Sequence, residues 1–238
     1  MASLWLQSAP EAWQAALDGY REAVAGLGKE RLPDLDRWFR EELPVALRSR
    51  QPPHLTHPEL VKLVDWKLLR GKWRPRLLDF AKQADPGGVE AASRAAFQAL
   101  GEPGSSSGAG CSKAAAEPTE AAIKQALAEL CVLKGVGPAT ASAALEAFNP
   151  TVPFTSDQAM LAALNSKDYT VPKVLELTNA LRKKAAALSK ASGRQWTAQE
   201  VEQALFAAAV GGGSGSSGAA GGSSGAAGGS GSGKKRKR

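Results

Sequence analysis

The hydrophobic residues of this chain recur at the three- and four-residue spacing of an amphipathic helix. Within residues 4–25, for example, Trp13, Leu17, Tyr20 and Val24 share one face. Alternation with a period of two, which is typical of strands, is scarce, whereas alanine, leucine, glutamate and lysine fill the periodic segments. The pattern therefore predicts an all-α fold.

Glycines and prolines set the ends of the expected helices. The first helix is expected to end at Gly26, the second to close near Pro44, and a proline-rich connector follows at 50–58. The predicted helices span residues 4–25, 34–48, 58–70, 75–82, 88–100, 119–133, 139–148, 156–165, 171–190 and 197–209.

Two segments lack this periodicity because small residues dominate them. Residues 101–118 are rich in glycine, serine and alanine, and residues 211–233 contain nothing else. Such compositions behave as flexible coil. We interpret residues 1–210 as one two-lobed helical body with a flexible insert at about 101–118, although a domain boundary there fits the same residues. Residues 211–238 are expected to be a disordered tail.

The net charge of +7 is concentrated at the C-terminus, where the last residues supply five of the charges. These residues are Lys234, Lys235, Arg236, Lys237 and Arg238. A basic cluster on a flexible segment is typical of a nuclear import signal, so we expect the protein in the nucleus. A solubilising tail, an auxiliary phosphate-binding arm or an engineered linker fits the same composition. The remaining body is nearly neutral, so any nucleic-acid surface on it must be a local patch.

Several functional classes are disfavoured by what the sequence does not contain. Cys111 and Cys131 are the only cysteines, too few for a disulfide framework or a cysteine-rich metal site. His54 and His57 have no third ligand nearby, so we expect no metal and no cofactor. We also expect no membrane span and no signal peptide. No P-loop or nucleophile elbow supports a kinase, ATPase or esterase.

A short segment between two predicted helices carries the clearest pattern in the chain. Residues 133–141 read LKGVGPATA, in which two glycines predict a tight hairpin and Pro138 suits the first turn of the next helix. Main-chain N–H groups at such a turn are free to bind an anion. We expect a DNA backbone phosphate to be held here. The expected contacts are Gly135, Val136, Gly137 and Ala139, assisted by Lys134 and Thr140. A turn that merely joins two core helices is the alternative.

A basic block lies earlier in the chain, at the end of a predicted helix. We expect it to supply a second set of phosphate contacts, if it folds onto the same side as the hairpin. The block consists of Lys67, Arg70, Lys72, Trp73, Arg74 and Arg76. Trp73 suits either stacking on a base or packing against its neighbours, whereas Trp66 is expected in the core. A solvated turn after the helix is the alternative for the cations.

The hairpin, the apolar helix after it, and Asp157 twenty residues beyond Gly137 together resemble the helix–hairpin–helix DNA glycosylases. Residues 66–76 are similar to the Amun-type nuclear glycosylase-like proteins. The resemblance implies two α-helical lobes with an active site between them, where Asp157 is the catalytic carboxylate. Bifunctional members also use a lysine in the hairpin; the matching residue here is Ala139, so a lyase step through that position is not expected. The iron–sulfur cluster of some members is excluded because no cysteine follows Val171.

The chemistry of N-glycosidic bond cleavage explains why a carboxylate belongs at this position. Positive charge develops on the sugar, and Asp157 would stabilise it or orient water once the base has left the duplex. The alternative for Asp157 is a structural one, with Thr155 as N-cap and Gln158 as the third helical residue of a capping box.

The sequence therefore predicts a nuclear DNA-binding protein that contacts the DNA backbone without sequence specificity. If it is an enzyme, we expect a monofunctional DNA N-glycosylase. A catalytically inactive nuclear DNA-binding or protein-binding regulatory module is the alternative, and a helical adaptor without DNA affinity is a third. No residue pattern identifies a protein partner.

Overall fold

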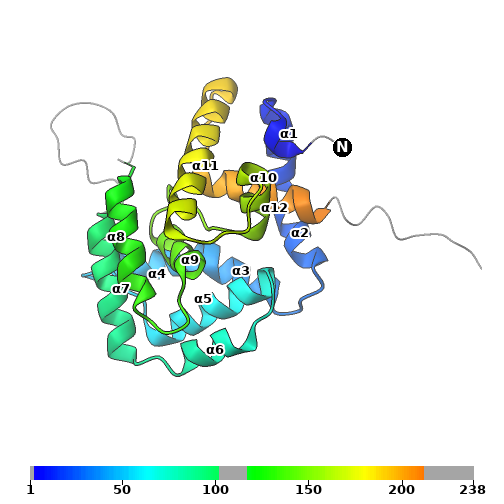
Figure 1. The fold of residues 1–238 in the computed structure, drawn as a ribbon. Helices are drawn as coiled ribbons and strands as arrows, with labels where there is room; N and C mark the ends of the chain where they lie inside the picture. The colour runs from blue at the N-terminus through cyan, green and yellow to red at the C-terminus, as the bar shows by residue number, and fades with distance from the viewer. Residues whose placement is uncertain (1–2, 102–116, 212–238) are drawn as a thin grey trace, which may run out of the picture.

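The computed structural model describes residues 3–101 and 117–211, and all regular structure in these two ranges is helical (Figure 1). The prediction of an all-α fold is therefore confirmed. Most of the expected flexible insert, Cys111, and residues 212–238 of the expected tail, with the basic cluster, lie outside the described residues, whereas Gly211 is the last residue of α12 and not part of a disordered tail.

The helices follow the sequence prediction closely after residue 56. In chain order, the elements are η1 (Leu4–Leu6), α1 (Pro10–Asp18), α2 (Tyr20–Gly26), α3 (Leu32–Arg37), η2 (Trp38–Glu42), α4 (Leu43–Ser49), α5 (His57–Arg70), α6 (Pro75–Lys82), α7 (Pro86–Leu100), α8 (Glu120–Cys131), α9 (Pro138–Phe148), α10 (Asp157–Leu164), α11 (Val171–Ser192) and α12 (Ala198–Gly211).

The single helix predicted for residues 4–25 is wrong, because that segment forms three short elements. A 3₁₀ turn (η1) comes first, and α1 begins only at Pro10, whose missing N–H is tolerated in the first turn. Gly19 then separates α1 from α2, consistent with the low helix propensity of glycine.

The expected end near Pro44 is also wrong, because the chain stays helical from α3 through α4. The intervening η2 is a π-helical turn in which the Leu43 N–H donates to the Trp38 carbonyl, five residues back. This wider turn changes the hydrogen-bond register just before Pro44, so the missing N–H of the proline does not interrupt the helix.

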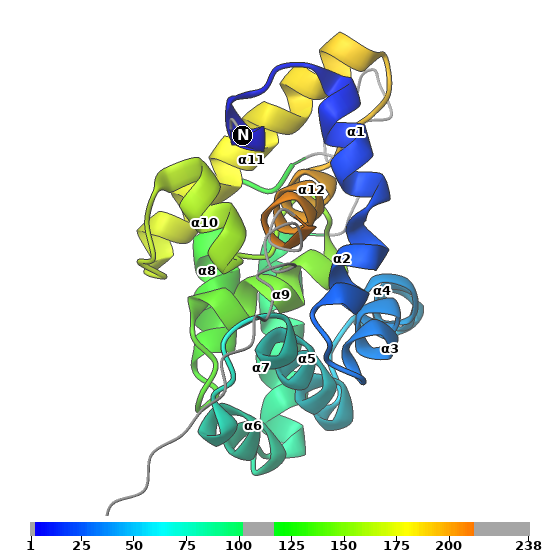
Figure 2. The same ribbon diagram turned by 90° about the vertical axis from the view of Figure 1, so that its right-hand side faces the viewer.

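The core consists of two hydrophobic clusters. The larger one includes stacked pairs, Phe39 on Trp66 at 3.8 Å between ring centroids and Phe97 on Phe148 at 4.5 Å. The smaller one joins α1, α10, α11 and α12 around Trp13. In both views α1 and α11 lie towards one end, α5 and α6 towards the other, and α9 between them (Figures 1 and 2). Residues 140–148 of this central helix are all buried.

A buried charge network connects the central helix to its neighbours. The Arg70 guanidinium donates to both carboxylate oxygens of Glu202, at 2.8 and 2.9 Å. Arg40 donates to Glu146 and, at 3.0 Å, to the Tyr20 hydroxyl. Burial raises the pKa of Tyr20 strongly, so its hydroxyl keeps its proton. Buried ions are tolerated only when they are paired in this way.

Removing one partner from this network is expected to destabilise the fold far more than removing a surface partner. Glu202→Gln leaves the Arg70 guanidinium buried without its counter-ion, so we expect the free energy of unfolding to fall by about 3–5 kcal/mol. Glu41→Gln breaks the exposed Arg21–Glu41 pair and is the matched control, with a change within about 1 kcal/mol. Urea denaturation measures both, and equal effects would contradict the assigned role.

Candidate functional site

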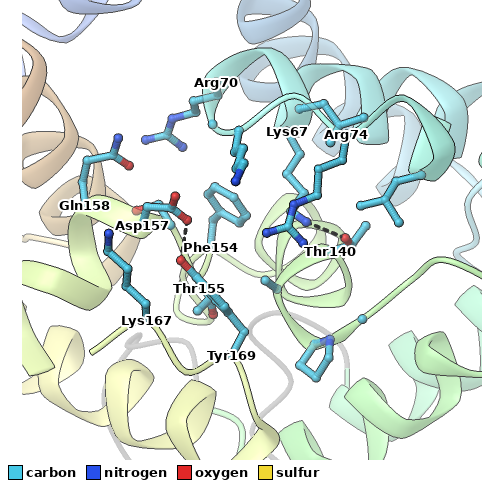
Figure 3. A pocket seen from close by; sticks show the side chains of 18 of the residues that line it. Lys67, Arg70, Arg74, Thr140, Phe154, Thr155, Asp157, Gln158, Lys167 and Tyr169 are labelled. Atoms are coloured by element: carbon cyan, nitrogen blue, oxygen red, sulfur yellow. Dashed lines mark hydrogen bonds between the residues drawn. The ribbon is translucent and has the colours of Figure 1, made fainter. Parts of the chain in front are cut away.

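A cleft of about 510 Å³ opens where the end of α5, the hairpin before α9 and the start of α10 meet. The hairpin, the basic block and Asp157, which are far apart in the sequence, all contribute to its walls. Its lining residues are Lys67, Leu68, Arg70, Gly71, Lys72, Arg74, Leu77, Gly135, Gly137, Pro138, Ala139, Thr140, Phe154, Thr155, Ser156, Asp157, Gln158, Lys167 and Tyr169. Figure 3 shows Lys67 and Arg74 on one side of this cleft and Asp157, Gln158 and Lys167 on the other.

Three of the four main-chain N–H groups expected to bind phosphate are available in the hairpin. Those of Gly135, Gly137 and Ala139 have no hydrogen-bond partner among the described residues, and all three residues line the cleft. The expectation for Val136 needs correction, because its N–H donates to the Leu133 carbonyl at 3.0 Å and its side chain is buried.

Gly135 makes the hairpin possible through its conformation and its lack of a side chain. Its φ of +84° lies in the left-handed region, which other residues adopt only with strain. A Cβ at this position would lie 2.9 Å from two atoms of Phe80 in α6. Gly137 has a φ of −100° and serves as the N-cap residue of α9. The hairpin therefore rests directly on α6.

Lys134 and Thr140, the expected assisting residues, contact other side chains. The Lys134 ammonium lies 4.7 Å from the centre of the Phe80 ring, and Lys134 does not line the cleft. The buried Thr140 hydroxyl accepts a hydrogen bond of 2.8 Å from the Lys67 ammonium. The pKa of Lys67 is lowered to about 8, chiefly by burial and also by the positive charge of Arg74, while Asp157 opposes both effects.

Asp157 is exposed at the first position of α10, with its side chain in the cleft. The capping alternative is wrong in its register: the N-cap is Ser156, whose hydroxyl accepts from the Ala159 N–H at 3.2 Å, not Thr155. The Asp157 carboxylate instead accepts a hydrogen bond from the Tyr169 hydroxyl. Burial and this carboxylate raise the pKa of Tyr169, so the tyrosine remains a donor.

The position of Asp157 is set by α9, the same helix that begins at the hairpin. The Ser142 hydroxyl accepts the Thr155 N–H at 2.9 Å, and the Glu146 carboxylate accepts the Phe154 N–H. Both contacts hold the segment immediately before Asp157. The twenty-residue spacing from Gly137 therefore corresponds to one helix and a return loop bound to that helix.

The basic block is divided between the cleft, the protein interior and the outer surface. Lys72 and Arg74 are exposed and line the cleft. Arg70 was expected on the surface, but its side chain is 1% exposed because it pairs with Glu202, so it does not offer solvent a free cation. Trp73, which is 47% exposed, and Arg76 lie outside the lining of the cleft, so neither shares it with Asp157.

Sequence reasoning missed two polar residues that the fold brings into the cleft. Lys167 and Tyr169 lie in the connection between α10 and α11, where no motif or periodicity identifies them. Their closeness to Asp157 depends on the path of that loop rather than on its composition.

Trp66 was expected in the core, and it is fully buried with its indole N–H donating to Asp36 at 2.8 Å.

The described residues contain no group of three or more histidine, cysteine, aspartate or glutamate side chains suited to a metal ion. His57 contacts the Ala81 carbonyl at 3.0 Å through its Nε2 atom. None of the described helices combines the length and hydropathy needed to span a bilayer.

No protein-family model, curated protein or solved structure matches this chain.

The two hairpin glycines are expected to respond differently to the same substitution. Gly135→Ala places a Cβ against Phe80 and forces alanine into the left-handed region, so we expect a loss of about 1–3 kcal/mol in the free energy of unfolding. Gly137→Ala meets nothing within 4 Å and should change stability by less than about 1 kcal/mol. Urea denaturation of the two variants checks this; an equal response would show that the Phe80 contact is unimportant.

Proposed function

We propose that this chain binds the DNA backbone at the cleft and acts there as a DNA N-glycosylase of the helix–hairpin–helix type. One observation carries the proposal: Asp157 opens into the same cleft as the three unpartnered hairpin amides. Cleavage of an N-glycosidic bond builds positive charge on the sugar, and a carboxylate beside a turn that holds the neighbouring phosphate is well placed to stabilise that charge.

The electrostatics of the cleft support binding of a polyanion. Lys67, Lys72, Arg74 and Lys167 line it, with Asp157 as the acidic residue among the lining side chains. Main-chain amides and cations of this kind fix the position of a sugar–phosphate strand without reading the bases. The volume of about 510 Å³ lies in the range of ligand pockets and suits an extruded base.

Asp157 is the group proposed to act on the sugar. Its contact with the Tyr169 hydroxyl fixes the orientation of the carboxylate at the N-terminus of α10. From there it would stabilise the oxocarbenium-like charge and orient a water molecule. No amine of the hairpin lines the cleft: Ala139 occupies the position of the lysine used by bifunctional enzymes, and the Lys134 ammonium lies against the Phe80 ring.

A catalytically inactive nuclear DNA-binding or protein-binding module is the second candidate. It is favoured by the Tyr169 hydrogen bond, because this contact occupies one oxygen of the only carboxylate that lines the cleft within the described part of the chain. In either case the basic cluster from Lys234 to Arg238 is proposed to direct the protein to the nucleus.

Binding through phosphate contacts predicts a characteristic dependence on salt. Arg74→Ala should reduce the slope of log K against log salt concentration by about 1, because one fewer counterion is released. Arg21 pairs with Glu41 on the surface and does not line the cleft, so Arg21→Ala should leave the slope unchanged. Fluorescence anisotropy with a labelled duplex measures both, and the absence of any salt dependence would contradict DNA binding.

Catalysis predicts that base release depends on Asp157. Asp157→Asn should slow release from duplexes that contain alkylated, deaminated or oxidised bases by at least about 100-fold, while DNA binding persists. Asp79→Asn alters an exposed carboxylate of α6 outside the cleft and should release bases at the wild-type rate. Free bases are measured by chromatography. DNA binding without release from any of these duplexes would support the inactive module instead.

A further inference from the structure

Lys67 is an amine that the proposed glycosylase step does not use. It lies in the last turn of α5 and lines the cleft, and its Nζ atom donates to the Thr140 hydroxyl of α9 at 2.8 Å. No carboxylate among the described residues lies within ion-pair distance of it. Figure 3 shows the lysine side chain extended to this hydroxyl beside Arg74. The amine is therefore fixed in the cleft by a neutral group rather than neutralised by an acid.

This environment increases the fraction of uncharged amine. Burial and the nearby Arg74 lower the pKa of Lys67 to about 8, against the opposing effect of Asp157. The uncharged form is therefore more populated near neutral pH than in an ordinary lysine, whose pKa is about 10.4. A lysine desolvated next to another cation is a nucleophile that attacks carbonyl carbons.

The chemistry of the proposed reaction supplies such a carbonyl. When a base leaves DNA, the remaining deoxyribose is in equilibrium with its open form, which has an aldehyde at C1′. A strand held by the hairpin amides with its sugar at Asp157 places this aldehyde in the cleft that Lys67 lines. Lys72 and Lys167 also line the cleft, but they are exposed and lack a contact that holds the amine in place.

We propose that Lys67 forms a Schiff base with the C1′ aldehyde of an abasic site, which makes abasic DNA a substrate class of this cleft. The inference rests on the proposed DNA binding. The Nζ lone pair attacks C1′ to give a carbinolamine. The C1′ oxygen then leaves as water, taking up one proton from the amine and one from solvent, and a protonated imine remains. Addition of water reverses the sequence and restores the free amine.

The position of this amine distinguishes it from one supplied by the hairpin. Lys67 reaches the cleft from α5, and its contact with Thr140 places Nζ beside the first turn of α9. The amine therefore comes from α5 and not from the hairpin, although both elements line the same cleft.

Reduction with borohydride tests the inference, because it converts an imine into a stable secondary amine. The full chain is incubated with a duplex that contains one abasic site, treated with sodium borohydride, and analysed by gel and by peptide mass spectrometry. We expect a covalent protein–DNA adduct at Lys67, with a yield that rises as the pH increases through about 8. Lys67→Arg should reduce the yield at least tenfold.

Lys184→Arg is the matched control. Burial also lowers the pKa of Lys184, but its ammonium lies against Trp5 and Trp13 and donates to the Trp5 carbonyl at 2.9 Å, outside the cleft. This variant should give the wild-type yield. Circular dichroism and anisotropy with the abasic duplex establish that Lys67→Arg still folds and binds; if it does not, the site of the adduct in the wild-type protein decides.

The outcomes separate this inference from the proposed function. An adduct that maps to Lys234, Lys235 or Lys237 of the tail, or to no residue in a protein that binds the duplex, overturns the role of Lys67 and leaves DNA binding intact. Absence of binding to both intact and abasic duplexes overturns the proposed function and this inference together. Base release from damaged duplexes without any trapping leaves the glycosylase and removes the Schiff base.

Discussion

The cleft depends on one buried carboxylate, that of Glu146 in α9. It accepts hydrogen bonds from Arg40, from the Phe154 N–H and, at 3.0 Å, from the Gln199 side chain. Burial raises the pKa of Glu146, and the Arg40 guanidinium opposes that rise. A carboxylate removed from water requires such donors, and here they come from η2, from the loop before α10 and from α12. Together with the Ser142–Thr155 contact, these buried hydrogen bonds tie the segment before Asp157 to the helix that begins at the hairpin.

Much of the fold was predictable because the local signals agree with the tertiary structure. Prolines at the first turn and apolar residues at helical spacing gave α5 to α12 their approximate bounds, and α6 its observed ones, Pro75–Lys82. Pro44 misled the prediction, because a π-helical turn stabilised by packing carries the helix past it. No local rule identifies such a turn, since its hydrogen-bond register differs only when the neighbouring helices are in place.

The candidate site also has parts that the sequence predicted and parts that it did not. The hairpin and Asp157 were predictable from the sequence because both are held by one helix, α9, so that their separation along the chain is a fixed spacing. Arg70 was misplaced because its partner, Glu202, lies 132 residues further along the chain. The contact between Lys67 and Thr140 joins residues 73 apart and has no local signal either. Burial of a charged group is decided by its distant partners, and a pattern of neighbouring residues does not contain them.

The exposure of Trp73 has a practical consequence for spectroscopy. Of the six tryptophans, all within the described residues, the other five are buried or half-buried, whereas Trp73 is 47% exposed. A collisional quencher such as acrylamide therefore reaches this indole first. Lys72 and Arg74 on either side of it line the cleft, so we expect a strand bound there to reduce the access of the quencher to Trp73. Trp73 is therefore an intrinsic fluorescent probe beside the cleft, and no external dye has to be attached.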